Sequence, residues 1–181
     1  MPTTTTLISD ADIKGRIRSL AAEIEHDYPP HEGIHLVAIL KGGFMFMADL
    51  VRAMSDRVTM DFMAVSSYGK GTTSSGQVRV LKDLDSNVEG RHVILVEDIV
   101  DSGLTLSYLV RNLQARSPAT LEVCALLTKP ERRQTDITCR YVGFEIPNRF
   151  AIGYGLDYGE RYRSLPYVAA LDESRLPEDL I

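Results

Sequence analysis

Apolar residues along the chain follow two different spacings, which predict strands and helices in alternation. Continuous or alternating apolar runs indicate half-buried and buried strands, whereas apolar positions three and four residues apart indicate helices. By the first criterion, buried strands are expected over residues 34–40, 59–66, 92–97 and 121–127. Shorter β segments are expected near 141–144, 150–154 and 168–171.

Helical spacing predicts three helices between these strands. Ser9-Asp10-Ala11-Asp12 resembles a capping box and should start the first helix, which the prolines after Tyr28 should end. The second helix follows Lys41-Gly42-Gly43, and the third spans 104–115. In the second helix the residues expected to face inward are Phe44, Met47, Leu50 and Val51. This order predicts an α/β fold with a mostly parallel central sheet flanked by helices.

Length and composition fit one domain over residues 1–181. A chain of 181 residues with 44% hydrophobic and 25% charged residues can bury a substantial core. We expect residues 1–8 to form a loose tail and residues 67–78, which are rich in Gly, Ser and Thr, to form a mobile loop. The strand-poor C-terminal third should form a small cap, or hood.

Charge and cysteine content narrow the class of protein. The net charge of −5 argues against a broad nucleic-acid-binding surface, so no nucleic-acid partner is expected. There is neither a signal peptide nor an apolar run of about 20 residues, so we expect no membrane association. The two cysteines, Cys124 and Cys139, do not have the spacing of a zinc site or a disulfide framework. A cytoplasmic location is the simplest expectation.

The segment 92–106 holds the most informative pattern. An apolar strand runs into Glu97 and Asp98, and a small-residue turn then leads into a helix. Ligands bind at this edge of open α/β sheets, and the free N–H groups of such a turn suit a phosphate. Acids for sugar hydroxyls beside a cradle for a phosphate predict a phosphorylated sugar as ligand. The turn consists of Asp101, Ser102, Gly103, Leu104 and Thr105.

This segment closely resembles the phosphoribosyl-pyrophosphate (PRPP) signature of the type I phosphoribosyltransferases. The resemblance implies that Glu97 and Asp98 serve the ribose hydroxyls, directly or through a magnesium shell. It also implies that residues 101–105 wrap the 5-phosphate, with Ser102 and Thr105 offering hydroxyls. Glu97 and Asp98 are adjacent, so they can share one ligand only where the strand ends and the backbone turns.

Three further elements of the resemblance concern the pyrophosphate. Lys41 and Gly42 offer a cation and a close backbone approach after a buried strand. Relatives often carry a non-proline cis peptide in this turn, which a sequence does not reveal. The Ser67-Tyr68 pair closes over the pyrophosphate in relatives, and Arg163 has the planar fork that suits phosphate oxygens.

The C-terminal third resembles the hypoxanthine-guanine phosphoribosyltransferases, and with the other motifs the likeness covers roughly residues 35–171. Lys129 can donate to O6 of a 6-oxopurine, Phe150 can stack on the base, and the backbone of Ala151 can contact its pyrimidine edge. The carbonyl near Asp157 can accept from a 2-amino group, and the Asp157 carboxylate would bind Mg²⁺, which prefers oxygen ligands. Adenine would place an amino donor against Lys129 and should be rejected.

The implied reaction joins hypoxanthine or guanine to PRPP, giving IMP or GMP and pyrophosphate with Mg²⁺ as cofactor. Asp101 is expected to take the N7 proton as catalytic base. Two alternatives stay open at this point: a phosphoribosyltransferase that prefers xanthine, and a PRPP- or nucleotide-sensing RNA-binding regulator on the same fold. Family members are commonly oligomers, so a homodimer or homotetramer is expected.

Overall fold

The computed structural model describes residues 4–68 and 77–172. Its centre is a six-stranded sheet in the order β4-β3-β2-β5-β6-β7, and every neighbouring pair is parallel except β3 with β4. The α/β prediction with a mostly parallel sheet is therefore confirmed. The strands are β2 (Ile34–Leu40), β3 (Val58–Tyr68), β4 (Gln77–Lys82), β5 (His92–Val100), β6 (Thr120–Thr128) and β7 (Tyr141–Glu145).

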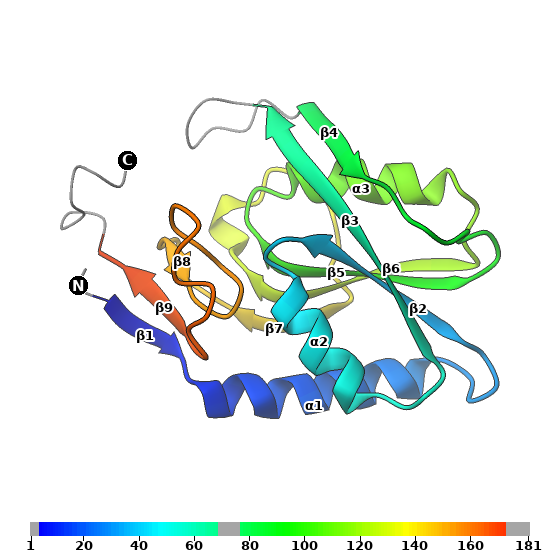
Figure 1. Cartoon of the computed structure of the whole chain (residues 1–181), viewed down its shortest axis with the longest axis horizontal. Helices are drawn as coiled ribbons and strands as arrows, with labels where there is room; N and C mark the ends of the chain where they lie inside the picture. The colour runs from blue at the N-terminus through cyan, green and yellow to red at the C-terminus, as the bar shows by residue number, and fades with distance from the viewer. Residues whose placement is uncertain (1–3, 69–76, 173–181) are drawn as a thin grey trace.

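Helices cover both faces of this sheet. Alternate residues of the parallel strands point to opposite faces, so Leu36 packs with α1 (Asp10–Asp27) and α2 (Phe44–Ala53), whereas Val37 packs with α3 (Leu104–Gln114). Figure 1 shows α1 and α2 together on the side of the sheet opposite to α3. Among the described residues, no helix is both long enough and apolar enough to cross a membrane.

The first helix begins where the sequence predicted, whereas the buried face of the second helix differs from the prediction. Ser9 caps α1 as expected, because its hydroxyl accepts a hydrogen bond from the Asp12 amide at 3.2 Å. In α2 the inward position expected for Phe44 is wrong. Phe44 is 38% exposed, and Phe46 is fully buried in its place.

A small second sheet forms the hood at one end of the molecule, on the left in Figure 1. Its order is β1 (Thr4–Ile8), β9 (Val168–Leu171) and β8 (Ala151–Ile152), with antiparallel pairing throughout. The expected loose tail is thus wrong for residues 4–8, which form an edge strand of the hood. The first and last strands of the described part, β1 and β9, pair with each other in this sheet.

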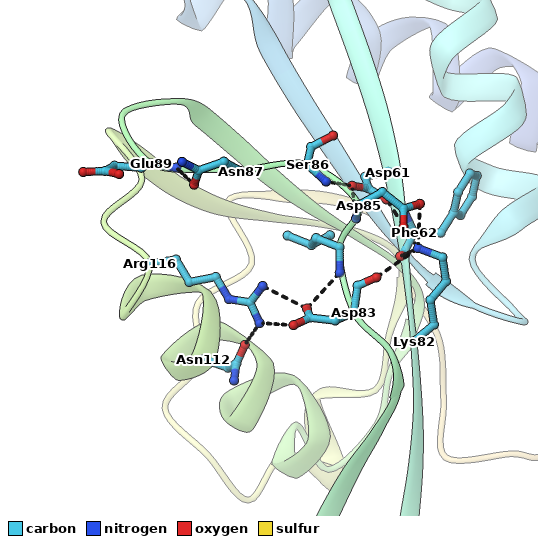
Figure 2. Close-up of polar contacts among 11 residues, drawn as sticks. Asp61, Phe62, Lys82, Asp83, Asp85, Ser86, Asn87, Glu89, Asn112 and Arg116 are labelled. Carbon is cyan, nitrogen blue, oxygen red and sulfur yellow. Dashed lines mark hydrogen bonds and ion pairs between the residues drawn. The ribbon is translucent and has the colours of Figure 1, made fainter.

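Strand β4, which the sequence did not predict, changes the boundaries of the expected loop. Residues 67, 68, 77 and 78 belong to strands, whereas residues 69–76 lie outside the described part. Figure 2 shows how the chain after β4 is anchored: the buried Asp61 carboxylate accepts from the amides of Asp85 and Ser86, each at 2.9 Å. Arg116, two residues after the end of α3, pairs with Asp83 at 2.8 Å and donates to Asn112 of α3 at 2.7 Å, which ties the same segment to the helix.

Candidate active site

The predicted PRPP turn lies where β5 ends and α3 begins. A cavity of about 130 Å³ opens there. The first amides of a helix lack partners within the helix, so the start of α3 can present N–H groups to an anion in this cavity. Asp98 and Leu104 apart, the residues expected at the ribose and phosphate line this cavity. Its lining is Glu97, Ile99, Val100, Asp101, Ser102, Gly103, Thr105 and Leu106.

Gly103 is the residue that allows this turn. It precedes α3 with a φ of 81°, a left-handed conformation that glycine adopts without steric cost. A Cβ at this position would also lie 2.4 Å from the Thr135 hydroxyl oxygen. The turn therefore requires glycine for two reasons: the backbone is left-handed, and Thr135 leaves no room for a Cβ.

The segment after β6 docks onto the PRPP turn through backbone hydrogen bonds. The Lys129 amide donates to the Val100 carbonyl at 3.0 Å, and the Gln134 amide donates to the Ser102 carbonyl at 2.9 Å. Between them, Pro130–Arg132 forms a short 3₁₀ helix. This docking, which the sequence analysis did not anticipate, brings Lys129, the residue expected to contact the purine, next to the turn expected to bind the phosphate.

Asp101 is held by two cations from this docked segment. One carboxylate oxygen lies 3.2 Å from the Lys129 Nζ, and the other lies 2.8 Å from the Arg132 Nε. Lys129 is buried, with a side chain 8% exposed, whereas the Asp101 side chain is 38% exposed. The expected base and the expected purine-binding lysine are thus in direct contact. Arg132 was missed, although a proline directly after a strand signals a turn that could have pointed to it.

Glu97 and Asp98 face opposite sides of the sheet. Strand β5 stays regular through this point, with Glu97 opposite Ala125 and Ile99 opposite Leu127. Glu97 therefore reaches the cavity beside the turn, whereas Asp98 reaches the Lys41-Gly42 turn on the other face. The sequence analysis allowed the two acids to share one ligand only if the strand ended between them. The strand continues, so they do not point towards one ligand.

Burial gives both carboxyl groups an unusual affinity for protons. Burial and the neighbouring Asp98 charge raise the pKa of Glu97 well above its usual range. Burial also raises the pKa of Asp98 to about 6, against the opposing effects of the Ile99 amide and the Arg163 guanidinium. The two side chains are poorly stabilised as anions in the free protein, so a cation bound beside them would be favoured.

The Lys41-Gly42 turn lies between β5 and the hood. The Leu40–Lys41 peptide bond is cis. A Cβ at Gly42 would overlap the Asp98 carboxylate, and a Cβ at Gly155 would lie 2.2 Å from the Gly42 carbonyl oxygen. The turn is therefore in close contact with Asp98 on one side and with the hood on the other.

Lys41 and Arg163, both expected at the pyrophosphate, meet at a carboxylate. The Lys41 Nζ lies 2.9 Å from Glu160 Oε2, and the Arg163 Nη2 lies 3.4 Å from both Glu160 oxygens. Arg163 also pairs with Asp157 at 2.9 Å and donates to the Gly155 carbonyl at 2.7 Å. Glu160 is a second residue that sequence reasoning missed.

The remaining purine-site residues lie in the hood. Phe150 is half-buried and packs edge-on against Tyr158, with 5.5 Å between the ring centroids. Ala151 is buried in β8, where it pairs with Ala170 of β9. The Asp157 carboxylate accepts from the Glu160 amide at 2.9 Å as well as from Arg163. The hood thus fixes the backbone at Ala151 and orients the Asp157 side chain.

Two expectations stay outside this geometry. The side chains of Ser67 and Tyr68 lie beyond what the structure describes. Within residues 4–68 and 77–172, no three His, Cys, Asp or Glu side chains cluster as a ready-made metal site.

Comparison with known proteins gives the family. The phosphoribosyl transferase domain family matches residues 6–159 of this chain. The hypoxanthine-guanine phosphoribosyltransferase of Mycobacterium tuberculosis strain H37Rv is 50% identical over 171 residues, covering 92% of this chain and 85% of that protein. The Bacillus subtilis enzyme of the same name is 48% identical, and the match covers 91% of each chain.

Solved structures agree with this match. The Bacillus anthracis hypoxanthine-guanine phosphoribosyltransferase, which holds a HEPES molecule in its active site, superposes with a TM-score of 0.90 at 46% identity, covering 95% of this chain and all of that one. A Staphylococcus aureus hypoxanthine phosphoribosyltransferase gives the same TM-score at 43% identity, covering 94% and 92% of the two chains. Fold, PRPP turn and similarity along most of its length together show that the chain belongs to the hypoxanthine-guanine phosphoribosyltransferase family.

Proposed function

We propose that the protein transfers the phosphoribosyl group of PRPP to hypoxanthine or guanine, releasing pyrophosphate. The observation that carries this proposal is the contact between Asp101 and Lys129, at 3.2 Å beside the phosphate turn. This contact places a proton acceptor, Asp101, beside Lys129, which can donate a hydrogen bond to an oxygen of the purine. The relatives named above, with about half of their residues identical, carry the same activity in their names.

Purine binding would rearrange this contact. Lys129 donates to O6 of the base in place of Asp101, and one Asp101 oxygen becomes free to accept the N7 proton. Arg132 keeps its hold on the other oxygen, 2.8 Å away. N9 of the purine then bonds to C1 of the ribose as the C1–O bond to pyrophosphate breaks, and Asp101 retains the proton taken from N7.

The acids on β5 and in the hood fit a magnesium ion. Mg²⁺ is commonly bound by one or two carboxylates together with substrate oxygens. Glu97 is buried and Asp98 half-buried, the pKa of each carboxyl group is raised, and the Asp157 charge contributes to the raised pKa of Asp98. We assign Asp157 and Asp98 to this ion, and Glu97, which faces the other side of the sheet, to the ribose hydroxyls. When bound, it would neutralise negative charge on the departing pyrophosphate.

Phosphate recognition falls to the turn and the cations around it. The start of α3, with Ser102 and Thr105, would bind the 5-phosphate. Lys41, the Gly42 backbone and Arg163 would bind pyrophosphate, together with Ser67 and Tyr68. Phe150 would stack on the purine, and the backbones of Ala151 and Asp157 would contact its edge.

Two attributes of the whole protein belong to the same proposal. We expect a cytoplasmic enzyme, in keeping with the free thiols of Cys124 and Cys139. We also expect a homodimer or homotetramer. A Trypanosoma cruzi hypoxanthine phosphoribosyltransferase, 45% identical, was studied for the role of its C-terminal region in oligomeric state and activity. Light scattering of the purified protein tests the assembly.

The direct test is the initial rate with PRPP, Mg²⁺ and each of hypoxanthine, guanine, xanthine and adenine. We expect pyrophosphate release with hypoxanthine and guanine. Adenine should give about 0.6–20% of those rates, because a mismatched buried donor costs about 1–3 kcal/mol. Equal rates with adenine would refute the role of Lys129, and no turnover with any base would refute the proposed reaction.

A further inference from the structure

The carboxylate of Glu160 sits between two cations that the proposed function assigns to pyrophosphate. Lys41 donates to Glu160 Oε2 at 2.9 Å, and the Arg163 Nη2 lies 3.4 Å from each Glu160 oxygen. Lys41 and Glu160 have side chains 66% exposed, so both can move, whereas Arg163 is 20% exposed and fixed from below by the Gly155 carbonyl. An anion of the protein therefore occupies the position where an anion of the substrate is expected.

The backbone holds Glu160 at this position in an uncommon way. Tyr158 and Arg161 exchange two backbone hydrogen bonds of 3.1 Å, which closes a two-residue turn over Gly159 and Glu160. Both central residues have positive φ, 57° and 63°, as in a type I′ turn. Glycine and asparagine are favoured there, and a glutamate is disfavoured by its Cβ. The Glu160 amide also donates to Asp157 Oδ2 at 2.9 Å, which locks the turn.

Glu160 occupies one of the N–H groups through which the Arg163 guanidinium could bind pyrophosphate. Nη1 is used by the Gly155 carbonyl, and Nη2 is shared between Asp157 and Glu160. The buried Nε has no hydrogen-bond partner among residues 4–68 and 77–172. Pyrophosphate that binds the Nη2 of Arg163 and the ammonium group of Lys41 would compete with the Glu160 carboxylate for these donors.

We propose that Glu160 is a built-in competitor of pyrophosphate. It neutralises Lys41 and Arg163 in the free enzyme, is displaced when the pyrophosphate group of PRPP binds, and returns as the product leaves. It therefore weakens binding of pyrophosphate and speeds its release. This inference rests on the proposed function for the assignment of Lys41 and Arg163 to pyrophosphate.

The size of the effect follows from the exposure of the groups. A single exposed ion pair changes an equilibrium constant by about 1.5- to 5-fold, and Glu160 contacts two cations. Removing its charge should therefore tighten pyrophosphate binding about 3- to 10-fold at low salt. Exposed charges are screened within about 3 Å at 1 M ionic strength, so the effect should mostly vanish there.

The test compares Glu160→Gln with the wild type. We expect the inhibition constant of pyrophosphate, measured against PRPP, to fall about 3- to 10-fold in dilute buffer, with less than a twofold change at 1 M salt. Glu160→Asn should behave in the same way, because asparagine loses the charge but suits the left-handed turn. An unchanged or raised constant in E160Q, or tightening in E160Q without tightening in E160N, would overturn the proposal.

A matched control uses another exposed glutamate in an ion pair. Glu23 pairs with Arg16 at 2.6 Å on α1, and Glu23→Gln makes the same change of net charge away from the site. Its pyrophosphate constant should match that of the wild type, and equal tightening in E23Q would overturn a local role for Glu160.

Calorimetry with inorganic pyrophosphate and Mg²⁺ repeats the comparison without turnover. A wild type that makes no product would reject the proposed reaction, and the binding comparison would still decide the role of Glu160. A wild type that turns over normally, with E160Q unchanged in both assays, would reject the role of Glu160 alone.

Discussion

Replacing Asp98 by asparagine should stabilise the free protein at neutral and higher pH. Burial raises the pKa of Asp98 from 3.8 to about 6, against the opposing effects of the Ile99 and Asp98 amides, and the carboxylate lies against the Gly42 backbone. The ionised side chain is therefore unfavourable in the fold. Asparagine keeps the shape and removes the charge.

The magnitude follows from the difference in pKa between the folded and unfolded chains. A shift of about two units at about 1.4 kcal/mol each gives about 3 kcal/mol. Because the folded pKa lies above the unfolded value, the folded state binds more protons, and wild-type stability falls as pH rises from about 4 to 6. The full cost is present above that window and absent below it. For a domain of this size, 3 kcal/mol corresponds to a rise in Tm of roughly 6–12 °C.

Thermal unfolding followed by circular dichroism between pH 4 and pH 8 measures this effect. We expect Asp98→Asn to unfold at higher temperature than the wild type at pH 8, and the gain to shrink steadily towards pH 4. A gain of the same size at both ends of the range, or none at pH 8, would refute the argument from burial.

Asp61 provides a control of the opposite sign. Burial raises the pKa of its carboxyl group, but the amides of Phe62, Ser86 and Asp85 outweigh this and lower the pKa overall. Its stabilisation is present above the unfolded pKa and is lost as pH falls through the lower folded pKa. Asp61→Asn should therefore destabilise the protein at pH 8, by about 1–3 kcal/mol for the lost charge-assisted hydrogen bonds, and less at acid pH.

Three further changes test the site. Lys129→Gln should raise the KM for hypoxanthine about 10- to 100-fold, since a charged hydrogen bond to O6 is lost; an unchanged KM would remove Lys129 from base recognition. Arg132→Gln should lower kcat about 3- to 10-fold with little change in either KM, and Arg132→Lys should recover part of it, because Arg132 orients Asp101. Gly103→Ala should lower the free energy of unfolding by about 1–3 kcal/mol in urea titrations, through the positive φ and the approach to Thr135. A stability equal to wild type would contradict that reading of the turn.

The sequence predicted the parts of the fold that local patterns encode. The buried runs of β2, β5 and β6 are continuous and apolar, so their bounds agree with the prediction within three residues. Strand β1 was missed because Thr4–Thr6 are exposed and polar, and only pairing with β9 makes them a strand. Phe44 and Phe46 are two residues apart at the start of a helix, and the pattern alone did not decide which one is buried.

In the functional site, too, the sequence predicted contiguous motifs but not contacts between distant segments. The PRPP motif is contiguous, so its residues could be named from the sequence, and all of them except Asp98 and Leu104 line one cavity. The ion pairs of Asp101 with Arg132 and of Lys41 with Glu160 join residues 31 and 119 positions apart. Contacts of this kind arise from the docking of whole segments, which no local pattern reports.

The central claim is that Asp101 serves as the base in phosphoribosyl transfer. The most direct measurement is the initial rate of IMP formation from hypoxanthine and PRPP by the wild type and by Asp101→Asn, with PRPP binding measured in parallel. We predict a loss of roughly 10²- to 10⁴-fold in turnover with PRPP affinity retained. Turnover by D101N equal to that of the wild type would contradict the account.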